Sequence, residues 1–297
     1  MYEQEGFIPV EDGYRVWYRS VGGGGEQEDV PLLVLHGGPG APHDYLDNLA
    51  ALASDTRQVI FYDQLGCGRS DKLDEDTIRQ WGVQRFVDEL ATVRRELGLD
   101  RVHILGQSWG GMLAIEYALT QPAGLVSLIL SNTTPSIPLW VAEANRLRAA
   151  LPPEVNAILL RYEEAGATDA AEYQEAMTVF YGRHVVRVNP MPDFVQRAFD
   201  NIGAVYSIMN GPSEFYITGV IKDWDRSDRL SEIRVPTLII SGEYDESTPT
   251  INELLHKGIA GSEWTLLENC SHLSHVEEPE RYMQLVRNFL QKVEGAE

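Results

Sequence analysis

The chain has 297 residues, of which 43% are hydrophobic and 23% charged, as is typical of a folded globular protein rather than a disordered or fibrous one. Its 45 acidic residues outnumber its 24 lysines and arginines, so the formal net charge is -21. A surface this acidic repels phosphate backbones and anionic lipids, so we expect no nucleic-acid partner and no membrane partner.

The N-terminus and the cysteines favour a cytoplasmic location. Residues 1–7 have neither the basic region nor the apolar region of a signal peptide. The apolar runs are only as long as strands, so we expect no transmembrane helix. Cys67 and Cys270 are too few to build a disulfide framework. We therefore expect a globular protein in the reducing environment of the cytoplasm.

Apolar runs that alternate with helical patterns predict the core of the fold. Residues 7–19 alternate between apolar and polar side chains, which predicts an antiparallel hairpin at a sheet edge. Residues 83–97 carry apolar side chains at helical spacing. Continuous apolar runs occur at residues 31–35, 58–62, 101–105, 125–130, 236–240 and, more weakly, 263–267. Such runs, separated by helices, indicate a mostly parallel sheet covered on both faces, so the predicted fold class is α/β, doubly wound.

One long stretch interrupts this alternation. Between residues 137 and 230 no run resembles a buried strand, and helical patterns occur instead at 138–150, 153–165, 169–181 and 193–201. Pro153 fits the first turn of a helix, and Asp169 and Asp193 fit N-caps. We therefore expect a helical cap at 137–230, inserted between two parts of the core at 1–136 and 231–297.

A candidate nucleophile lies between the run at 101–105 and the helical pattern at 111–120. The sequence Gly106-Gln107-Ser108-Trp109-Gly110 matches G-x-S-x-G, and this position after a strand and before a helix is the context that the motif requires. The turn exposes the serine hydroxyl near a helix N-terminus, whose partial positive charge favours a developing anion. The alternative is a glycine-rich turn with an ordinary serine. We expect Ser108 to be catalytic.

An acyl-transfer site also needs two backbone donors for the oxyanion. One donor should be the N–H of Trp109, the residue after the nucleophile, and the other should come from the loop after an earlier strand. The sequence His-Gly-Gly-Pro-Gly at 36–40 directly follows the run at 31–35, and its glycines allow close approach to a substrate. Gly38 is the preferred donor and Gly37 the competing one, and the alternative is a plain turn.

The acid and the base should follow the serine in the chain. The sequence Glu-Tyr-Asp-Glu at 243–246 follows the run at 236–240, and His272 follows the last run. We therefore expect Asp245 to orient His272, which takes the proton of the serine. Glu243 and Glu246 compete with Asp245 by position. His275 competes with His272 but lies nearer the final helix, where a structural role is common.

Metal chemistry is not indicated. The remaining histidines lack the spacing of metal ligands and there is no H-E-x-x-H motif, so we expect no metal and no cofactor. His103 lies inside an apolar run and fits a buried structural histidine.

Together the motifs resemble the α/β-hydrolase superfamily and, more closely, the proline iminopeptidase family. The resemblance spans nearly the whole chain and rests on HGGPG at 36–40, DQLGCGRS at 63–70, GQSWGG at 106–111, NGPSEF at 210–215, SGEYDE at 241–246 and CSHLSHVEEP at 270–279. It implies an α/β-hydrolase fold with a helical cap, and it implies Ser108, Asp245 and His272 as the catalytic triad.

The resemblance also implies a serine aminopeptidase that removes one N-terminal residue, often proline. In that family two glutamates hold the substrate's α-ammonium group, and the corresponding residues here are Glu214 and Glu246. An ammonium group that leaves water needs charged hydrogen-bonding partners, which agrees with this role. The alternative for both residues is an ordinary solvated surface charge. The implied partners are short peptides or amino-acid amides with a free N-terminus.

Other functions fit the same residues. A hydrolase of amino-acid amides or esters would keep the ammonium site, whereas a general esterase or lactonase would lack it. A binding module without catalysis is disfavoured, because binding alone gives no reason to hold Ser, Asp and His in this order. The sequence leaves the oligomeric state open.

Overall fold

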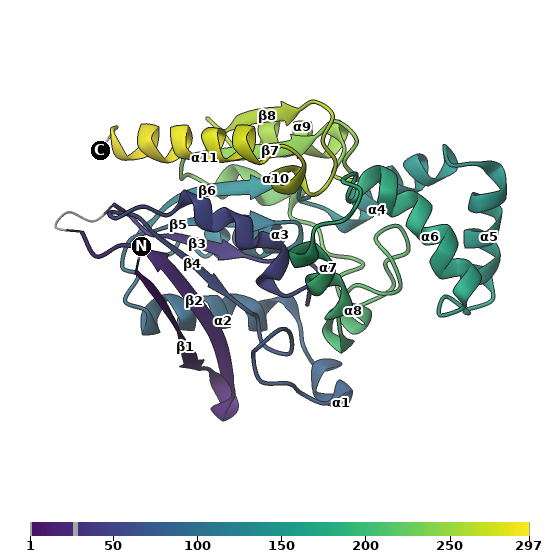
Figure 1. Ribbon diagram of the computed structural model, residues 1–297, viewed down its shortest axis with the longest axis horizontal. Helices are drawn as coiled ribbons and strands as arrows, with labels where there is room; N and C mark the ends of the chain where they lie inside the picture. Colours follow the sequence, from purple (N-terminus) through teal and green to yellow (C-terminus); the bar gives the residue numbers. More distant parts are fainter. Residues whose placement is uncertain (1, 26–28, 297) are drawn as a thin grey trace.

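The computed structural model describes residues 2–25 and 29–296. The two predicted core segments also include residues that lie outside the described residues, namely Met1, residues 26–28 and Glu297. The centre of the fold is one sheet in the order β1-β2-β4-β3-β5-β6-β7-β8 (Figure 1). The strands are β1 (Glu3–Pro9), β2 (Arg15–Gly22), β3 (Leu32–Leu35), β4 (Gln58–Tyr62), β5 (Val102–Gln107), β6 (Leu125–Ser131), β7 (Thr237–Gly242) and β8 (Glu263–Leu267).

The pairing of the strands confirms the predicted α/β class and the edge hairpin. Strands β1 and β2 pair antiparallel, and β2 pairs antiparallel with β4. From β4 to β8 every neighbouring pair is parallel. Parallel strands need crossover connections, which here are mostly helical.

The sheet is covered by helices on both faces, which explains why its central strands are continuously apolar. Along β3, Leu33 and Leu35 point into one hydrophobic cluster, and Leu32 and Val34 point into another. The first cluster contains side chains of α2 (Val83–Glu96), α3 (Trp109–Leu119) and α9 (Pro249–Gly258). The second contains side chains of the 3-10 segment η2 (His43–Leu52) and of α11 (Pro279–Glu294). Alternate residues of each central strand are therefore buried on opposite faces.

Five helices lie between β6 and β7 in the chain, and the described residues 137–230 contain no strand. They are α4 (Ile137–Ala149), α5 (Pro153–Glu164), α6 (Ala171–His184), α7 (Asp193–Asp200) and α8 (Ala204–Met209). Figure 1 shows α4, α5 and α6 beyond the end of the sheet. These three helices share an apolar cluster that includes Trp140, Leu159, Tyr173 and Phe180. Residues 137–230 are called the cap segment below.

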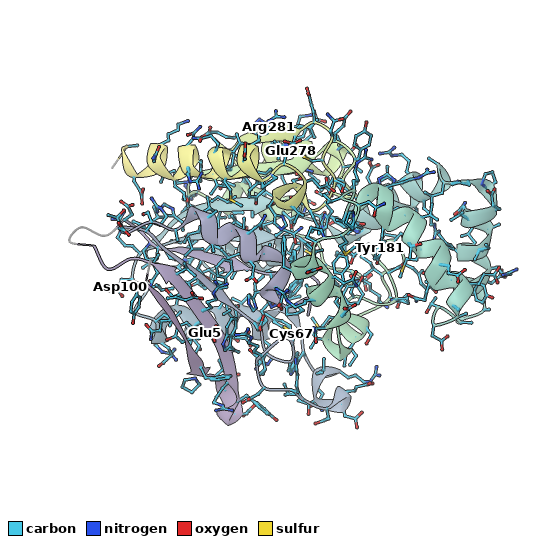
Figure 2. All side chains as sticks on the ribbon, viewed as in Figure 1. Glu5, Cys67, Asp100, Tyr181, Glu278 and Arg281 are labelled. Carbon is cyan, nitrogen blue, oxygen red and sulfur yellow. The ribbon has the colours of Figure 1, made fainter. Side chains whose placement is uncertain are left out.

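The last turn of α6 reaches the core. Tyr181 lies in this turn (Figure 2). The backbone N–H of His272 donates to the carbonyl of His184 over 3.1 Å, and the N–H of Leu273 donates to the carbonyl of Val185 over 3.0 Å. The cap segment is therefore fastened to the loop after β8 by backbone hydrogen bonds.

The structure corrects two predicted helix starts. Asp169 is not an N-cap, because α6 begins at Ala171 with Ala170 as its N-cap residue. Asp193 is not an N-cap either, because it is the first residue of α7 and Pro192 precedes it. Its carboxylate lies in the first turn, where it interacts with the helix dipole without capping an N–H. Pro153 begins α5 as predicted.

The remaining elements are short. They are η1 (Glu11–Gly13), α1 (Glu75–Ile78), η3 (Ser227–Glu232) and α10 (Ser274–Glu277). No helix in the described ranges combines the length and the apolar character that crossing a lipid bilayer requires.

Candidate active site

Ser108 lies in a sharp turn between β5 and α3. Its backbone has φ of 56° and ψ of -123°, a conformation that residues with a side chain rarely adopt. Glycines on both sides make the turn possible, because a Cβ on Gly106 would collide with the backbone of Gly110 and a Cβ on Gly110 would collide with the backbone of Leu35. The half-buried serine therefore sits at the N-terminus of α3, where free N–H groups favour negative charge.

The other predicted residues come from loops at the same edge of the sheet. Gly38 follows β3, Asp245 and Glu246 follow β7, and His272 follows β8. Because β3, β5, β7 and β8 belong to one parallel array, their carboxyl ends meet at one edge, where ligands of open α/β sheets bind. Residues more than 230 positions apart in the chain thus lie around one site.

The two glycines that compete as oxyanion donors have different surroundings. The N–H of Gly37 donates to the hydroxyl of Tyr45 over 2.7 Å, so it is already engaged. Gly38 lines a cavity together with Ser108 and Trp109. Trp109 is the first residue of α3, so its backbone N–H has no acceptor within the helix. The geometry therefore leaves Gly38 and Trp109 as the available donors beside the serine.

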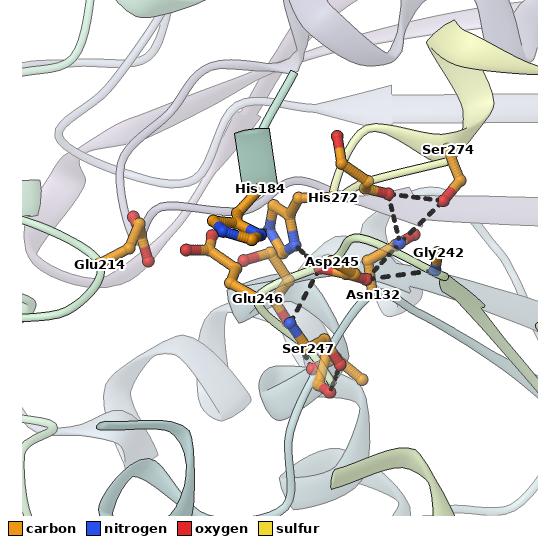
Figure 3. Close-up of polar contacts among 12 residues, drawn as sticks. Asn132, His184, Glu214, Gly242, Asp245, Glu246, Ser247, His272 and Ser274 are labelled. Carbon is orange, nitrogen blue, oxygen red and sulfur yellow. Dashed lines mark hydrogen bonds and ion pairs between the residues drawn. The ribbon is translucent and has the colours of Figure 1, made fainter. Parts of the chain in front are cut away.

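Asp245 and His272 form a buried pair. His272 Nδ1 lies 2.9 Å from Asp245 Oδ1. His272 is 5% exposed and Asp245 is 1% exposed. Asp245 also accepts from Asn132 Nδ2 over 2.7 Å and from the N–H of Ser247 over 2.8 Å (Figure 3). The carboxylate thus keeps its hydrogen bonds although it is out of water, and the imidazole is held with Nε2 directed away from the aspartate.

The competing residues lie in other environments. His275 Nε2 donates to the carbonyl of Tyr45 over 3.0 Å, and burial lowers the pKa of His275 to about 4, so this ring stays neutral. Glu243 is exposed, and its carboxylate accepts from the N–H of Asn269 over 3.0 Å. Neither of these two residues takes part in the Asp245–His272 pair.

Glu246 is a buried carboxylate without a hydrogen-bond partner among the described residues. Its side chain is 0% exposed, and neither carboxylate oxygen finds a donor. Oε1 lies 3.8 Å from Nε2 of His272 (Figure 3). Burial raises the pKa of Glu246 well above its ordinary value, and the neighbouring carboxylates of Glu214 and Asp245 raise it further. Burying a carboxylate without a hydrogen bond is costly, so a cation or a hydrogen-bond donor brought to this position would stabilise it.

Glu214 reaches the same region from the cap segment. Its Oε1 accepts from the hydroxyl of Tyr206 over 2.6 Å, and its backbone carbonyl accepts from Nε1 of Trp140 over 2.9 Å. Burial raises the pKa of Glu214, whereas the Tyr206 hydrogen bond and the nearby His272 act in the opposite direction. Trp140 also packs edge-on against the His272 ring, with 5.6 Å between ring centroids. Tyr206 and Trp140 therefore hold Glu214 next to the imidazole.

The cavity beside Ser108 is mainly apolar. Gly38, Trp109 and Glu214 line it, together with Met112, Ile137, Trp140, Ile217 and Ile221 from α3 and the cap segment. These side chains form an apolar wall next to the serine, with the carboxylate of Glu214 on the same cavity.

Several residues of the site were not found from the sequence. Asn132, Tyr45 and Gln107 all make hydrogen bonds within it. Only Asn132 carried a usable signal, because it directly follows β6 at the edge where the other site residues lie. The described residues contain no group of three or more His, Cys, Asp or Glu side chains arranged to hold a metal ion.

Comparisons with known proteins identify the fold and the family. The family described as the alpha/beta hydrolase fold matches residues 30–279. A proline iminopeptidase of Saccharolobus solfataricus is 41% identical over 295 residues, which cover 96% of this chain and 94% of the relative. One from Heyndrickxia coagulans is 42% identical over 295 residues, covering 97% and 99%. The crystal structure of a proline iminopeptidase from Mycobacterium smegmatis superposes with a TM-score of 0.89 at 40% identity, covering 99% of both chains.

Proposed function

Because this chain belongs to the proline iminopeptidases of the α/β-hydrolase family, we propose that it is a serine aminopeptidase that releases an N-terminal residue, preferably proline, from short peptides through an acyl-enzyme. The substrate is a short peptide with a free N-terminus. Side chains and backbone groups of this protein carry out the proposed reaction.

The proposed reaction has two halves. The hydroxyl of Ser108 attacks the carbonyl carbon of the first residue while His272 Nε2 takes its proton, and Asp245 holds the imidazole through Nδ1. The N–H groups of Gly38 and Trp109 stabilise the oxyanion. His272 then donates the proton to the leaving amine, and the shortened peptide departs. Water, activated by the same imidazole, releases the N-terminal residue from the serine.

The observation that carries the choice of substrate is the unpaired, buried carboxylate of Glu246. An α-ammonium group would supply the hydrogen bonds and the positive charge that this carboxylate lacks. Glu214 has one oxygen engaged by Tyr206, which leaves its other oxygen for the same ammonium group. A free α-amino group has a pKa of about 7.7–8.0, so it is largely charged near neutral pH. Two carboxylates, Glu214 on the cavity and Glu246 beside His272, would therefore limit the excised piece to one residue.

Replacing Glu246 tests this recognition. Glu246→Gln should lower kcat/KM for a prolyl naphthylamide about 10- to 100-fold, the loss expected when a charged hydrogen bond becomes a neutral one. Turnover of an N-acetylated ester should change little, because that substrate has no ammonium group. Glu243→Gln changes an exposed neighbour and is the matched control. Equal losses on both substrates would contradict the proposed ammonium site.

Two further comparisons separate the related activities. Prolinamide and a proline-initiated dipeptide, measured side by side, distinguish an amide hydrolase from a peptidase. N-acetylation should abolish turnover of the peptide substrate; unchanged turnover would instead identify a general esterase.

We also propose that the cap segment closes the site and that the enzyme works in the cytoplasm. The cap supplies Glu214 and Trp140, and its helix α6 is hydrogen-bonded to the His272 loop, which supports the first proposal. Cys67 and Cys270 are both unpaired and buried, which supports a reducing compartment.

A further inference from the structure

A chain of side-chain hydrogen bonds runs beneath the proposed oxyanion site. The Tyr45 hydroxyl, on η2, accepts the N–H of Gly37 over 2.7 Å and donates to Gln107 Oε1 over 2.6 Å. Gln107 Nε2 in turn donates to the carbonyl of His272 over 3.1 Å. The loops after β3 and β8 are thus joined through two side chains, one on η2 and one at the end of β5.

Both side chains are out of water. Tyr45 is 3% exposed and Gln107 is 1% exposed, so the hydrogen bonds between them have no competing solvent. Burial raises the pKa of Tyr45 above its ordinary value, so the hydroxyl keeps its proton and can donate to Gln107 while it accepts from Gly37. Every polar side-chain atom of Tyr45 and Gln107 thus has a defined donor or acceptor role in these hydrogen bonds.

These hydrogen bonds also determine how closely the loop at Gly37 approaches Ser108. A Cβ on Gly37 would lie 2.8 Å from the Tyr45 hydroxyl, 3.0 Å from Gln107 Oε1 and 3.0 Å from Ser108 Cβ. The loop therefore lies against the serine with the N–H of Gly37 turned toward Tyr45. With that N–H engaged, the next one, on Gly38, is the N–H available to a substrate oxygen.

His275, the histidine that competes with His272 in the sequence, has a role in this arrangement. Its Nε2 donates to the backbone carbonyl of Tyr45 over 3.0 Å, and the two rings pack edge-on with 5.8 Å between centroids. His275 thereby helps to fix the position of Tyr45.

We propose that Tyr45 and Gln107 are positioning residues for catalysis: by hydrogen-bonding Gly37 and the His272 loop, they set the distance between the oxyanion donor of Gly38, the nucleophile and the general base. This inference rests on the proposed function, because it assigns the oxyanion to Gly38 and Trp109. Neither side chain touches the substrate. Their effect is therefore expected on the transition state and not on substrate binding.

Tyr45→Phe is the direct test, because it removes only the hydroxyl. The variant should lower kcat about 10- to 100-fold while KM stays within about twofold, since misplacement of one oxyanion donor weakens transition-state stabilisation without removing a binding contact. The loss should be equal for a prolyl naphthylamide and for an N-acetylated ester. That equality distinguishes it from a Glu246 variant, whose loss is confined to substrates with a free amine.

Tyr62→Phe is the matched control. Tyr62 is also a fully buried tyrosine, but its hydroxyl has no hydrogen-bond partner among the described residues. Removing that hydroxyl should leave kcat and KM unchanged. A fall in melting temperature of Tyr45→Phe with an unchanged kcat would overturn the proposal, because it would show a purely structural role.

Gln107→Met gives an independent measurement and serves if Tyr45→Phe fails to fold. It keeps the length of the side chain and removes both of its hydrogen bonds, so kcat should again fall with KM unchanged. The fold-decrease in kcat of the double variant should be no more than about twice that of the worse single variant, because both changes break the same series of hydrogen bonds. A double variant whose fold-decrease in kcat equals the product of the two single decreases would contradict the proposal. If Ser108→Ala retained activity, the proposed function itself would fail; if it is inactive while Tyr45→Phe and Gln107→Met behave as wild type, only this inference fails.

Discussion

At the scale of single residues, the nucleophile stands out by its backbone. Among the described residues with a side chain, five have positive φ: Asp12, Ser108, Gln121, Asn132 and Asn269. Asparagine adopts such conformations readily, whereas serine does not. The strain at Ser108 is maintained by β5, α3 and the glycines around them, which is how a folded protein can hold an unfavourable conformation at a reactive group.

The strain at Ser108 leads to a stability prediction. Ser108→Ala should abolish turnover and leave the fold intact, because the hydroxyl is the attacking group and alanine can keep the same turn. Ser108→Gly should be about 1 kcal/mol more stable than the wild type, because glycine has no Cβ to oppose this conformation. Urea unfolding followed by circular dichroism measures the difference.

A serine in an ordinary helical conformation provides the comparison. Ser207 is exposed on α8, where glycine costs about 1 kcal/mol. Ser207→Gly should therefore destabilise the protein. If Ser108→Gly were destabilised to the same degree, the nucleophile would carry no backbone strain.

At the scale of elements, helix α2 carries a buried acid on its core face. Glu89 accepts from the N–H of Leu65 over 3.2 Å and from Arg85 over 2.9 Å. Tyr62 and Cys67 are the other titratable groups near it. Burial raises the pKa of Glu89 from 4.5 to about 7, although Arg85 and the Leu65 N–H act in the opposite direction. Ionising this group in the folded protein is therefore costly.

The raised pKa of Glu89 predicts a pH dependence of stability. Below pH 4.5 the group is protonated in both states, and between 4.5 and about 7 only the unfolded chain loses the proton. The free energy of unfolding should therefore fall as pH rises through this window, by about 3 kcal/mol in total from this group. Glu89→Gln should flatten the decline, measured by urea unfolding from pH 4.5 to 8.

The matched control for Glu89 is Asp88→Asn on the same helix. Asp88 is exposed and bonded to Gln84, so its replacement should leave the pH dependence as it is. If the free energy of unfolding of Glu89→Gln fell with pH as steeply as that of the wild type, the carboxyl of Glu89 would have the same pKa in the folded and unfolded states.

At the scale of the whole molecule, like charges oppose folding. The formal net charge of -21 results from 45 acidic and 24 basic residues. Exposed ion pairs such as Arg79–Glu75 offset little of this repulsion, because water and salt screen them. The same charge would attract the ammonium end of the proposed peptide substrate.

Screening this repulsion should stabilise the protein. The melting temperature at pH 8 should rise by roughly 3 °C between 10 mM and 300 mM NaCl, the change expected if screening recovers about 1 kcal/mol. At pH 5, where more carboxylates are protonated, the same salt should raise it less. A melting temperature that falls with salt at pH 8 would show that attractive ion pairs dominate the surface.

Much of the architecture could be predicted from the sequence because its signals are local. Strand β4 matches the predicted run at 58–62, since a strand buried on both faces must be apolar throughout. Strand β8 matches the weaker run at 263–267, although it lies at the edge of the sheet and is partly exposed. The turn at Ser108 could be located because glycines flank a serine between a strand and a helix. Helix starts were less predictable, and Asp169 and Asp193 failed as N-caps because the preceding turns, with Ala170 and Pro192, decide where those helices begin.

The sequence by itself determined the α/β class, the family and the loop on which each candidate side chain lies. The tertiary structure alone decided that Glu246 is buried without a hydrogen-bond donor among the described residues, that Asn132 holds Asp245, and that Tyr45 engages Gly37 so that Gly38 remains available. These features depend on side chains from distant segments that meet only after the strands have paired. The pattern of residue types along the sequence depends on neighbours in the sequence, whereas burial and side-chain hydrogen bonding depend on neighbours in space.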